Sequence, residues 1–345
     1  MDGSQGGKPP AGGGDVDRVG SAIIDFTEAA YDLGASDEDW LPTLLRRGLP
    51  VLEQGLGVAG YHFGIPPGAD RVELLDVHVA SGPEDFAERH LRALSTTDPE
   101  VLRNQLSSGA ATTGSEHAKD DPAQLAHYVS HVDYCKDVLF ITAVDQKGSG
   151  VALVAPLPEI TTLSRQDAQR WQMLAAHVEA GHRLRHAIDG EATDAEAPTG
   201  LPHDAEAIFD AKSFRITDAV GRAKERTTEN KLRDAAIEVD RARGSMRDTD
   251  PDSALEIWKA LVRGRWSIVD WFDTDGRRFV LAIPNSPEVT DPRGLSERES
   301  QVVASAVMGH TNKMIAYRLG LSTSRVSTLL RSAMRKLGVR TRAHL

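Results

Sequence analysis

The sequence contains a single cysteine, Cys135, in 345 residues. An internal disulfide needs two cysteines, so a disulfide framework is excluded, and this usage is typical of the reducing cytoplasm. Long hydrophobic runs are missing too, because no stretch approaches the roughly 18 consecutive apolar residues of a membrane helix. The N-terminal residues MDGSQGGKPPAGGGDVDR have no apolar core, which argues against a signal peptide. We therefore expect a cytoplasmic protein with no membrane partner.

The motifs of common catalytic sites are also missing. The chain has no P-loop, no nucleophile elbow and no HExxH motif. Acidic residues are numerous, but no two of them are paired for acid–base chemistry. The sequence therefore predicts no catalytic residue and no metal site and identifies no cofactor, so an enzyme is a disfavoured class of function.

Two patterns resemble ligand sites. Residues 55–60, GLGVAG, have the glycine spacing of a dinucleotide-binding loop, but such a loop follows a strand and opens a helix. Here a helical pattern precedes the glycines and a strand pattern follows, which favours a helix-to-strand turn. Histidines four residues apart are compatible with metal ligands, although packed or solvated histidines are more common. These are His127 and His131, followed by Cys135, and His182 with His186. We expect Cys135 to be a small buried side chain, with redox sensing as the alternative.

The charge is distributed unevenly along the chain. Residues 291–345 contain ten Lys or Arg and three Asp or Glu, a net charge of +7. Because the whole chain carries −11, the preceding residues carry −18. A basic module attached to an acidic body is the electrostatic pattern of a nucleic-acid reader. A basic tail without a partner is the alternative on charge alone.

The basic segment divides into three helical patterns joined by short turns. Ser296 followed three residues later by Glu299 forms a capping-box pattern, and Gly309 ends the first helix. Thr311 can cap a short second helix that Gly320 closes. The third helix is expected to begin at Ser322 or Thr323. The inner faces are expected to carry Leu295, Val302, Val303, Ala306 and Val307, then Ile315, Ala316 and Leu319, then Val326, Leu330, Ala333 and Leu337.

These spacings predict a helix-turn-helix unit. With the apolar residues turned inward, the outer face of the third helix carries polar and basic side chains. Residues at the front of such a helix reach base edges, while Lys and Arg around them reach phosphates. The outer-face residues are Ser324, Arg325, Thr328, Arg331 and Arg335, with Ser327 near the edge. A solvated amphipathic helix is the alternative.

The segment resembles the DNA-binding domain of LuxR-type transcription regulators. The resemblance covers about the last fifty residues. It rests on Leu295, Arg298, Glu299, Gly309, Asn312, Lys313, Ile315, Ala316, Leu319, Ser322, Val326, the run from Lys336 to Val339, and Arg342. It implies that the third helix enters the major groove of double-stranded DNA and that Lys313 and Lys336 lie near phosphates. The predicted DNA-binding residues are Asn312, Lys313, Ser324, Arg325, Ser327, Thr328, Arg331, Arg335, Lys336 and Arg342.

This sequence departs from the family pattern in three places. The family often has Lys at the position of Ser327 and His at that of Leu329, so base preference and salt dependence are expected to differ. The sequence also reaches Leu345 where the family's fourth helix would begin. That helix often supports dimers, so we expect dimer contacts elsewhere. Neither a receiver domain nor the Trp, Tyr and Asp run of acyl-homoserine-lactone sensors is visible.

The acidic body reads as two α+β domains. After a disordered tail (1–15), residues 16–189 show two helical patterns, the second with a possible break at Pro50, then strands, helices and a hairpin. A long helix from Ser164 to Ile188 ends this domain, whose order is similar to a GAF-like sensory module. That helix is a candidate dimer contact, or else it covers its own sheet.

A polar linker (190–204) is expected to lead to a small PAS-like domain (205–290). Its pattern has two short strands, a long helix over residues 220–243, a further helix and a final hairpin across Asp273–Gly276, DTDG. The helix-turn-helix domain follows (291–345). The overall class is therefore a multidomain α+β protein with an all-α C-terminal domain.

The favoured function is a cytoplasmic, homodimeric transcription regulator. Its α+β domains would sense an unknown small molecule or protein and bias the helix-turn-helix between free and engaged states. The alternative is an interaction scaffold that uses the helix-turn-helix unit for protein contacts. The basic third helix favours the regulator.

Overall fold

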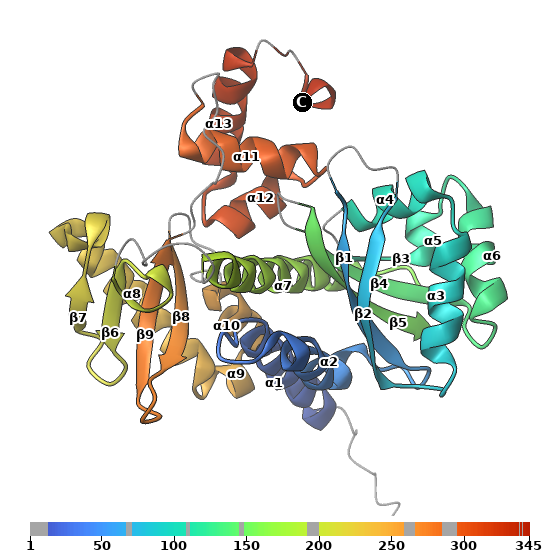
Figure 1. The fold of residues 1–345 in the computed structure, drawn as a ribbon, viewed down its shortest axis with the longest axis horizontal. Helices are drawn as coiled ribbons and strands as arrows, with labels where there is room; N and C mark the ends of the chain where they lie inside the picture. Colours follow the sequence, from blue (N-terminus) through green and yellow to red (C-terminus); the bar gives the residue numbers. More distant parts are fainter. Residues whose placement is uncertain are drawn as a thin grey trace, which may run out of the picture.

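The computed structural model describes residues 13–66, 71–107, 111–144, 148–191, 200–258, 266–284, 295–337, 339 and 341–345. Within these ranges the chain forms two antiparallel β-sheets, each with its own helices, and a separate group of C-terminal helices (Figure 1). The predicted α+β class of the body and the helical class of the C-terminal segment are confirmed. No helix in the described ranges is long and apolar enough to cross a membrane.

Two helices open the described chain, α1 (Gly13–Ala30) and α2 (Asp37–Leu52). The side chain of Ser36 caps α2 by accepting a hydrogen bond from the amide of Asp39 at 3.1 Å. The break considered at Pro50 does not occur, since α2 continues two residues beyond it. Pro50 is exposed in the last turn, where its missing N–H frees one carbonyl that water can satisfy.

The first sheet has five antiparallel strands in the order β2-β1-β5-β4-β3. The hairpin predicted after Cys135 is confirmed as β4 paired with β5, in a register that places Val144 opposite Gly150. The strand β3 had no clear sequence signal, because it has only three residues. The bounds are β1 (Val58–Gly64), β2 (Glu73–Ser81), β3 (Ala111–Thr113), β4 (Asp137–Val144) and β5 (Ser149–Leu157).

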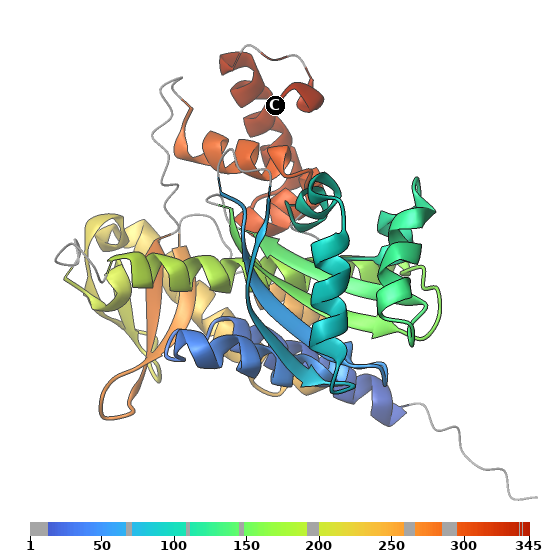
Figure 2. The same ribbon diagram turned by 45° about the vertical axis from the view of Figure 1, so that its right-hand side comes forward.

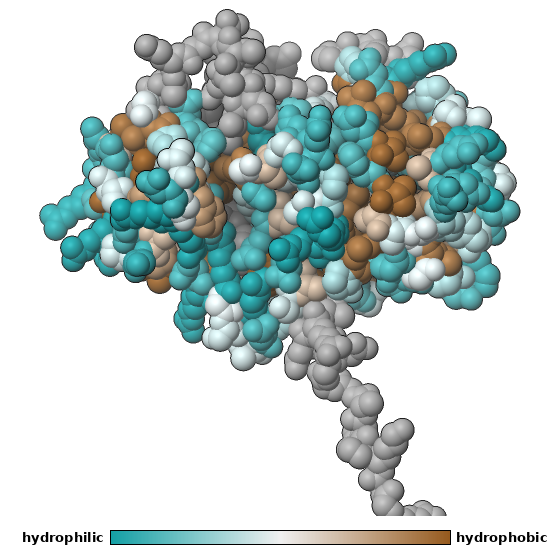
Figure 3. Space-filling view, turned by 60° about the horizontal axis from the view of Figure 1, so that its bottom comes forward, coloured by the Kyte–Doolittle hydropathy of each residue, from teal (hydrophilic) through white to brown (hydrophobic). Residues whose placement is uncertain are grey.

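Both faces of this sheet are covered by helices (Figure 2). Alternate residues of β4 enter two different apolar clusters, since Leu139 and Ile141 pack toward α1 and α2 while Val138 and Phe140 pack on the opposite side. The edge strand β2 leaves Leu75 and Val79 exposed. Figure 3 shows hydrophobic side chains gathered on the right, the side on which Figure 1 places this sheet. The helices opposite α1 and α2 are α3 (Phe86–Thr96), α4 (Pro99–Ser107), α5 (Gly114–His117) and α6 (Pro122–His131).

The long helix α7 (Arg165–Glu191) runs through the centre of the molecule (Figure 1). It contacts β3, β4 and β5 on one side and α1 and the C-terminal helices on others. Because its middle is surrounded by other elements of the chain, the polar residues His177, Glu179, His182 and Arg185 are buried there. Of the two interpretations of this helix, the structure supports the one in which it covers its own sheet.

The second sheet has four antiparallel strands in the order β7-β6-β9-β8. The two short strands and the final hairpin are confirmed. The single long helix expected over residues 220–243 is wrong at its start, where a 3₁₀ turn precedes α8. Residues 192–199 of the predicted linker lie outside the described residues. The bounds are η1 (Pro202–Asp204), β6 (Ala207–Asp210), β7 (Ile216–Ala219), η2 (Gly221–Lys224), α8 (Arg226–Arg243), α9 (Met246–Thr249), α10 (Pro251–Trp258), β8 (Trp266–Phe272) and β9 (Arg278–Pro284).

The two α+β parts pack on each other through α1. Arg247 of α9 forms ion pairs with Asp25 and Glu28 of α1, the second at 3.3 Å. Arg243 of α8 reaches the same Glu28 at 3.5 Å. Apolar residues of both parts also belong to one continuous core cluster. The two α+β parts therefore form one packed body.

Candidate nucleic-acid interface

The C-terminal bundle begins with α11 (Glu297–Val307), and its start is a capping box. The Ser296 hydroxyl accepts a hydrogen bond from the amide of Glu299 at 3.3 Å, and the carboxylate of Glu299 accepts one from the amide of Ser296 at 2.7 Å. Both bonds satisfy donors that the first turn of a helix leaves without a partner. The capping box predicted from the sequence is confirmed.

The next two helices, α12 (Asn312–Leu319) and α13 (Thr323–Lys336), form the helix-turn-helix. Thr311 caps α12 by accepting from the amide of Met314 at 3.3 Å. Gly320 ends α12 with φ of 61°, a left-handed conformation that favours glycine. Ser322, rather than Thr323, is the cap of α13. The predicted order of helix, short helix, turn and third helix is confirmed.

The three helices enclose a small apolar core of their own. Most of the predicted inner residues are buried, but Val307 is 58 % exposed. It is the last residue of α11. Leu329, which the sequence had not placed inside, is buried beside Leu330. The core residues are Val302, Ala306, Ile315, Ala316, Val326, Leu329 and Leu330.

The outer face of α13 is open to solvent. The five residues predicted for it are all exposed, namely Ser324, Arg325, Thr328, Arg331 and Arg335. Within the described ranges, none of the three arginines forms an ion pair. Their guanidinium groups are therefore available to charged oxygens of a partner such as DNA phosphates or to the acceptors of guanine.

Four other predicted residues lie around this face and make contacts within the bundle. Asn312 donates its side-chain amide to the Ser327 hydroxyl at 3.1 Å, and Arg342 donates to Asn312 Oδ1 at 3.1 Å. The Arg342 guanidinium also donates to the carbonyl of His310. Lys336 Nζ forms an ion pair with Glu299 Oε2 at 2.6 Å. These four residues therefore join the helices of the bundle. Lys336 would have to leave Glu299 before its ammonium group could bind a partner.

The remaining predicted residue, Lys313, has a different position. It is exposed in the first turn of α12 and lines a cavity between the bundle and the body. The structure therefore does not place Lys313 on the same surface as the α13 arginines. The outer face of α13 and the position of Lys313 are two separate features of the bundle.

The bundle packs on the body through α12, which contacts α7. Tyr317 of α12 bonds to His177 Nε2 at 2.7 Å, and His177 Nδ1 bonds to the hydroxyl of Tyr31 at 3.0 Å. The Tyr317 hydroxyl also lies 3.3 Å from the carbonyl of Leu255 in α10. Complete burial lowers the pKa of His177 to about 3, so its ring is neutral at physiological pH. One hydrogen-bonded chain therefore joins α7, α10 and α12 to Tyr31, the residue that follows α1.

A buried ion pair lies next to this chain. Arg318 of α12 pairs with Glu179 of α7, and both side chains are almost fully enclosed. Arg318 also lies against the His310 ring, with 2.5 Å between its guanidinium and Nδ1. Burial lowers the pKa of Arg318 to about 9, so the guanidinium remains charged at neutral pH. Removing either partner would leave a buried charge without compensation.

Sequence patterns alone did not identify this contact. Tyr317 and Arg318 fall on the side of α12 opposite its apolar residues, where an amphipathic helix ordinarily meets water. The available signal was in α7, where a run of small and apolar residues around His177 and Glu179 leaves no polar face for solvent. A helix that is apolar on all sides is covered on all sides.

The other ligand-like patterns have structural explanations. Gly55 and Gly57, both at positive φ, connect the end of α2 to β1, as expected for a helix-to-strand turn, and Gly60 lies within β1. His127 and His131 bond to backbone carbonyls. His182 is buried against Trp40 and His62 rather than solvated. Among the described residues no group of His, Cys, Asp or Glu is arranged to hold a metal ion. Cys135 is buried, and burial raises its pKa to about 11, which disfavours the reactive thiolate.

Comparison with known proteins places the C-terminal bundle in a family. Residues 293–345 match the family described as bacterial regulatory proteins, luxR family. The HTH-type transcriptional activator RamA of Corynebacterium glutamicum is 48 % identical over 48 residues, which are 14 % of this chain and 17 % of that protein. The similarity thus spans less than a fifth of the length of that relative. Together with the capped helices and the turn at Gly320, these matches identify residues 293–345 as a LuxR-family helix-turn-helix domain.

Proposed function

We propose that the chain is a sequence-specific, DNA-binding transcription regulator. The observation that carries this proposal is the open outer face of α13, with three arginines free of ion pairs among the described residues, in a domain of the LuxR family. The similar protein RamA is named as a transcriptional activator, which supports the same function. Ser324 and Arg325 are at the front of the helix and are suited to base edges, while Arg331 and Arg335 are suited to phosphates.

We further propose that the body senses a signal and controls the bundle. The GAF-like assignment of residues 16–189 and the PAS-like assignment of residues 205–290 remain part of this proposal. They are supported by the two separate antiparallel sheets, each flanked by helices. A homodimer in the cytoplasm also belongs to the proposal. Since the middle of α7 is buried within the chain, dimer contacts would come from other surfaces.

The DNA-binding proposal is tested with Arg325→Ala and Arg331→Ala in the full chain. Each variant should weaken binding to DNA from the chain's own promoter region by about 1–3 kcal/mol, or roughly 5- to 150-fold. Fluorescence anisotropy at fixed salt measures the affinity, and circular dichroism checks the fold. The matched control is Arg103→Ala, which removes an exposed arginine of α4 on the body. If both variants bind like the parent, the recognition helix is misassigned and the interaction-scaffold function becomes the better explanation.

A further inference from the structure

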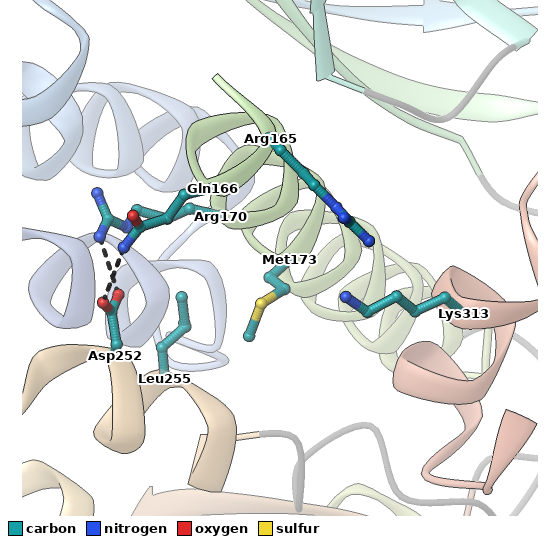
Figure 4. Close-up of a pocket in the computed structure, with 7 residues that line it drawn as sticks. All are labelled: Arg165, Gln166, Arg170, Met173, Asp252, Leu255 and Lys313. Atoms are coloured by element: carbon teal, nitrogen blue, oxygen red, sulfur yellow. Dashed lines mark hydrogen bonds and ion pairs between the residues drawn. The ribbon is translucent and has the colours of Figure 1, made fainter. Parts of the chain in front are cut away.

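A cavity of about 450 Å³ lies where the bundle meets both parts of the body (Figure 4). Its wall is formed by residues of α7, α10 and α12, which belong to three different regions of the chain. Met173 and Leu255 give it an apolar floor, and both are buried. Ligand pockets in proteins commonly have volumes of roughly 300–1,000 Å³ and combine apolar walls with a few polar groups. The volume of the cavity therefore lies within the range of small-molecule sites, and its lining is more polar than usual.

The charged side chains of the cavity are mainly cationic. Arg165, Arg170 and Lys313 contribute three positive charges, and Asp252 contributes one negative charge. Arg170 pairs with Asp252 at 2.9 Å, and Gln166 donates to the same carboxylate at 3.4 Å. The single carboxylate of the lining is therefore already engaged on one side of the cavity.

The other two cations point toward one shared space. Figure 4 shows the Arg165 guanidinium and the Lys313 ammonium extending toward each other from α7 and α12, with Met173 beside them. Like charges brought together raise the local positive potential, and an anion between them is attracted by both. Within the described residues Arg165 forms no ion pair.

Three of the lining residues lie at helix starts. Arg165 is the first residue of α7, and Asp252 and Lys313 are the second residues of α10 and α12. The amino-terminal end of each helix carries a partial positive charge, because the first N–H groups lack partners within the helix. The cavity thus combines an apolar floor with two converging cations that come from the starts of α7 and α12.

We propose that this cavity binds a small metabolite with two negative charges, either a dicarboxylate or an organic phosphate, between Arg165 and Lys313. Both chemistries present oxyanion groups that a guanidinium and an ammonium recognise. The ligand contacts both α7 and α12, so it binds the docked arrangement of the bundle and favours it over any arrangement in which the bundle has left the body.

The consequence for DNA binding rests on the proposed function. A metabolite that holds Lys313 against α7 keeps that lysine from a DNA phosphate. Linkage then requires that the metabolite weaken DNA binding and that DNA weaken metabolite binding by the same factor. The cavity would in this way be the effector site of the regulator.

Isothermal titration calorimetry on the full chain tests the site without DNA. The probes are succinate for the dicarboxylate class and glycerol phosphate for the organic phosphates, at an ionic strength held constant with chloride. Inorganic phosphate is the third probe. Binding of at least one organic probe should weaken about tenfold or more in Arg165→Ala, which loses a charge-assisted contact. The matched control Arg103→Ala should bind like the parent.

Three results would overturn the site. One is binding that is equal in the parent, Arg165→Ala and Arg103→Ala, which would mean nonspecific association. A second is the absence of heat for all three probes up to about ten millimolar, because a site with the charges described should bind more tightly than that. Binding of inorganic phosphate without either organic probe would also contradict a metabolite site of this volume.

Anisotropy with promoter DNA then tests the linkage. With a saturating organic probe at constant ionic strength, the parent should bind DNA at least about fivefold more weakly than without it. The ratio of the two affinities should approach one in Arg165→Ala. If calorimetry shows the site but this ratio is one in the parent, the cavity is not an effector site. Loss of DNA binding in every protein and condition would instead count against the proposed function and leave the calorimetric result intact.

Discussion

Glu299 connects the first and the last turn of the helix-turn-helix domain. Its carboxylate completes the capping box of α11 and also pairs with Lys336 at the end of α13. Although burial alone would raise the pKa of Glu299, hydrogen bonds from Lys336, Ser332 and Ser296 lower it to about 2. The spacing of Ser296 and Glu299 predicts the cap. That spacing does not predict the pairing of Glu299 with Lys336, because this pairing depends on how the three helices pack on one another.

The lowered pKa of Glu299 predicts a pH dependence of α11. Since the folded pKa of about 2 lies below the ordinary glutamate pKa of 4.5, the folded domain binds fewer protons than the unfolded chain between these pH values. The stabilisation is complete above about pH 4.5 and is lost as pH falls toward 2. Hydrogen-exchange protection of α11 amides, corrected for intrinsic rates, should therefore decrease over this window.

Glu299→Gln supplies the comparison for that measurement. Glutamine retains a capping-box acceptor but has no titrating group. The hydrogen-exchange protection of α11 amides in this variant should therefore depend less on pH between 4.5 and 2. The control Glu297→Gln changes the neighbouring acidic residue of the same first turn. A parent and a Glu299→Gln variant with the same pH profile would show that the carboxylate contributes no pH-dependent stability.

At the scale of secondary-structure elements, the sequence predicts features that depend on residue types at short, fixed spacing. It does not predict contacts between segments that are far apart in the chain. Helix caps, the turn at Gly320 and the β4–β5 hairpin follow from residue types at fixed spacing. The order of the sheets, the short strand β3 and the docking of α12 on α7 do not. The side of α12 that carries Tyr317 has the pattern of a solvated face, and only the fold shows that α7 covers it. For the same reason the position of Lys313 away from the α13 arginines was not foreseen.

The hydrogen-bonded chain through α12 predicts how Tyr317→Phe changes the domain contact. The substitution keeps the ring but removes the hydroxyl, which leaves His177 Nε2 buried without its partner. Such a loss costs about 1–3 kcal/mol, so exchange of α12 amides should rise about fivefold or more. Hydrogen-exchange mass spectrometry of the full chain measures the change.

A second buried tyrosine–histidine pair provides the control. Tyr128 bonds to His90 at 3.1 Å inside the first α+β part, away from the bundle. Tyr128→Phe should therefore increase exchange near α6 and leave α12 unchanged. If Tyr317→Phe leaves the exchange of α12 at the parent's rate, the hydroxyl makes no net contribution to docking.

At the scale of the whole molecule, opposite charges and a specific contact act together. The body carries −18 and the C-terminal residues +7, so the body attracts the bundle and repels DNA. Long-range attraction of this kind is weakened by salt, whereas the buried Arg318–Glu179 pair is screened much less. The docked arrangement should consequently persist at salt concentrations that already reduce DNA binding. The outer face of α13 stays exposed while the bundle is docked, so docking restrains DNA binding through Lys313 and through the nearby negative body.

Glu179→Gln tests whether docking restrains DNA binding. The substitution keeps the shape of the side chain but leaves the Arg318 charge buried without compensation, which disfavours docking by about 3–5 kcal/mol. The bundle should then leave the body, the radius of gyration measured by X-ray scattering should increase, and promoter DNA should bind at least about tenfold more tightly. The control Glu159→Gln removes an exposed carboxylate paired with Lys136 on the body, with similar loss of net charge. An opened Glu179→Gln chain that binds DNA with the parent's affinity would mean that docking positions the bundle without restraining it.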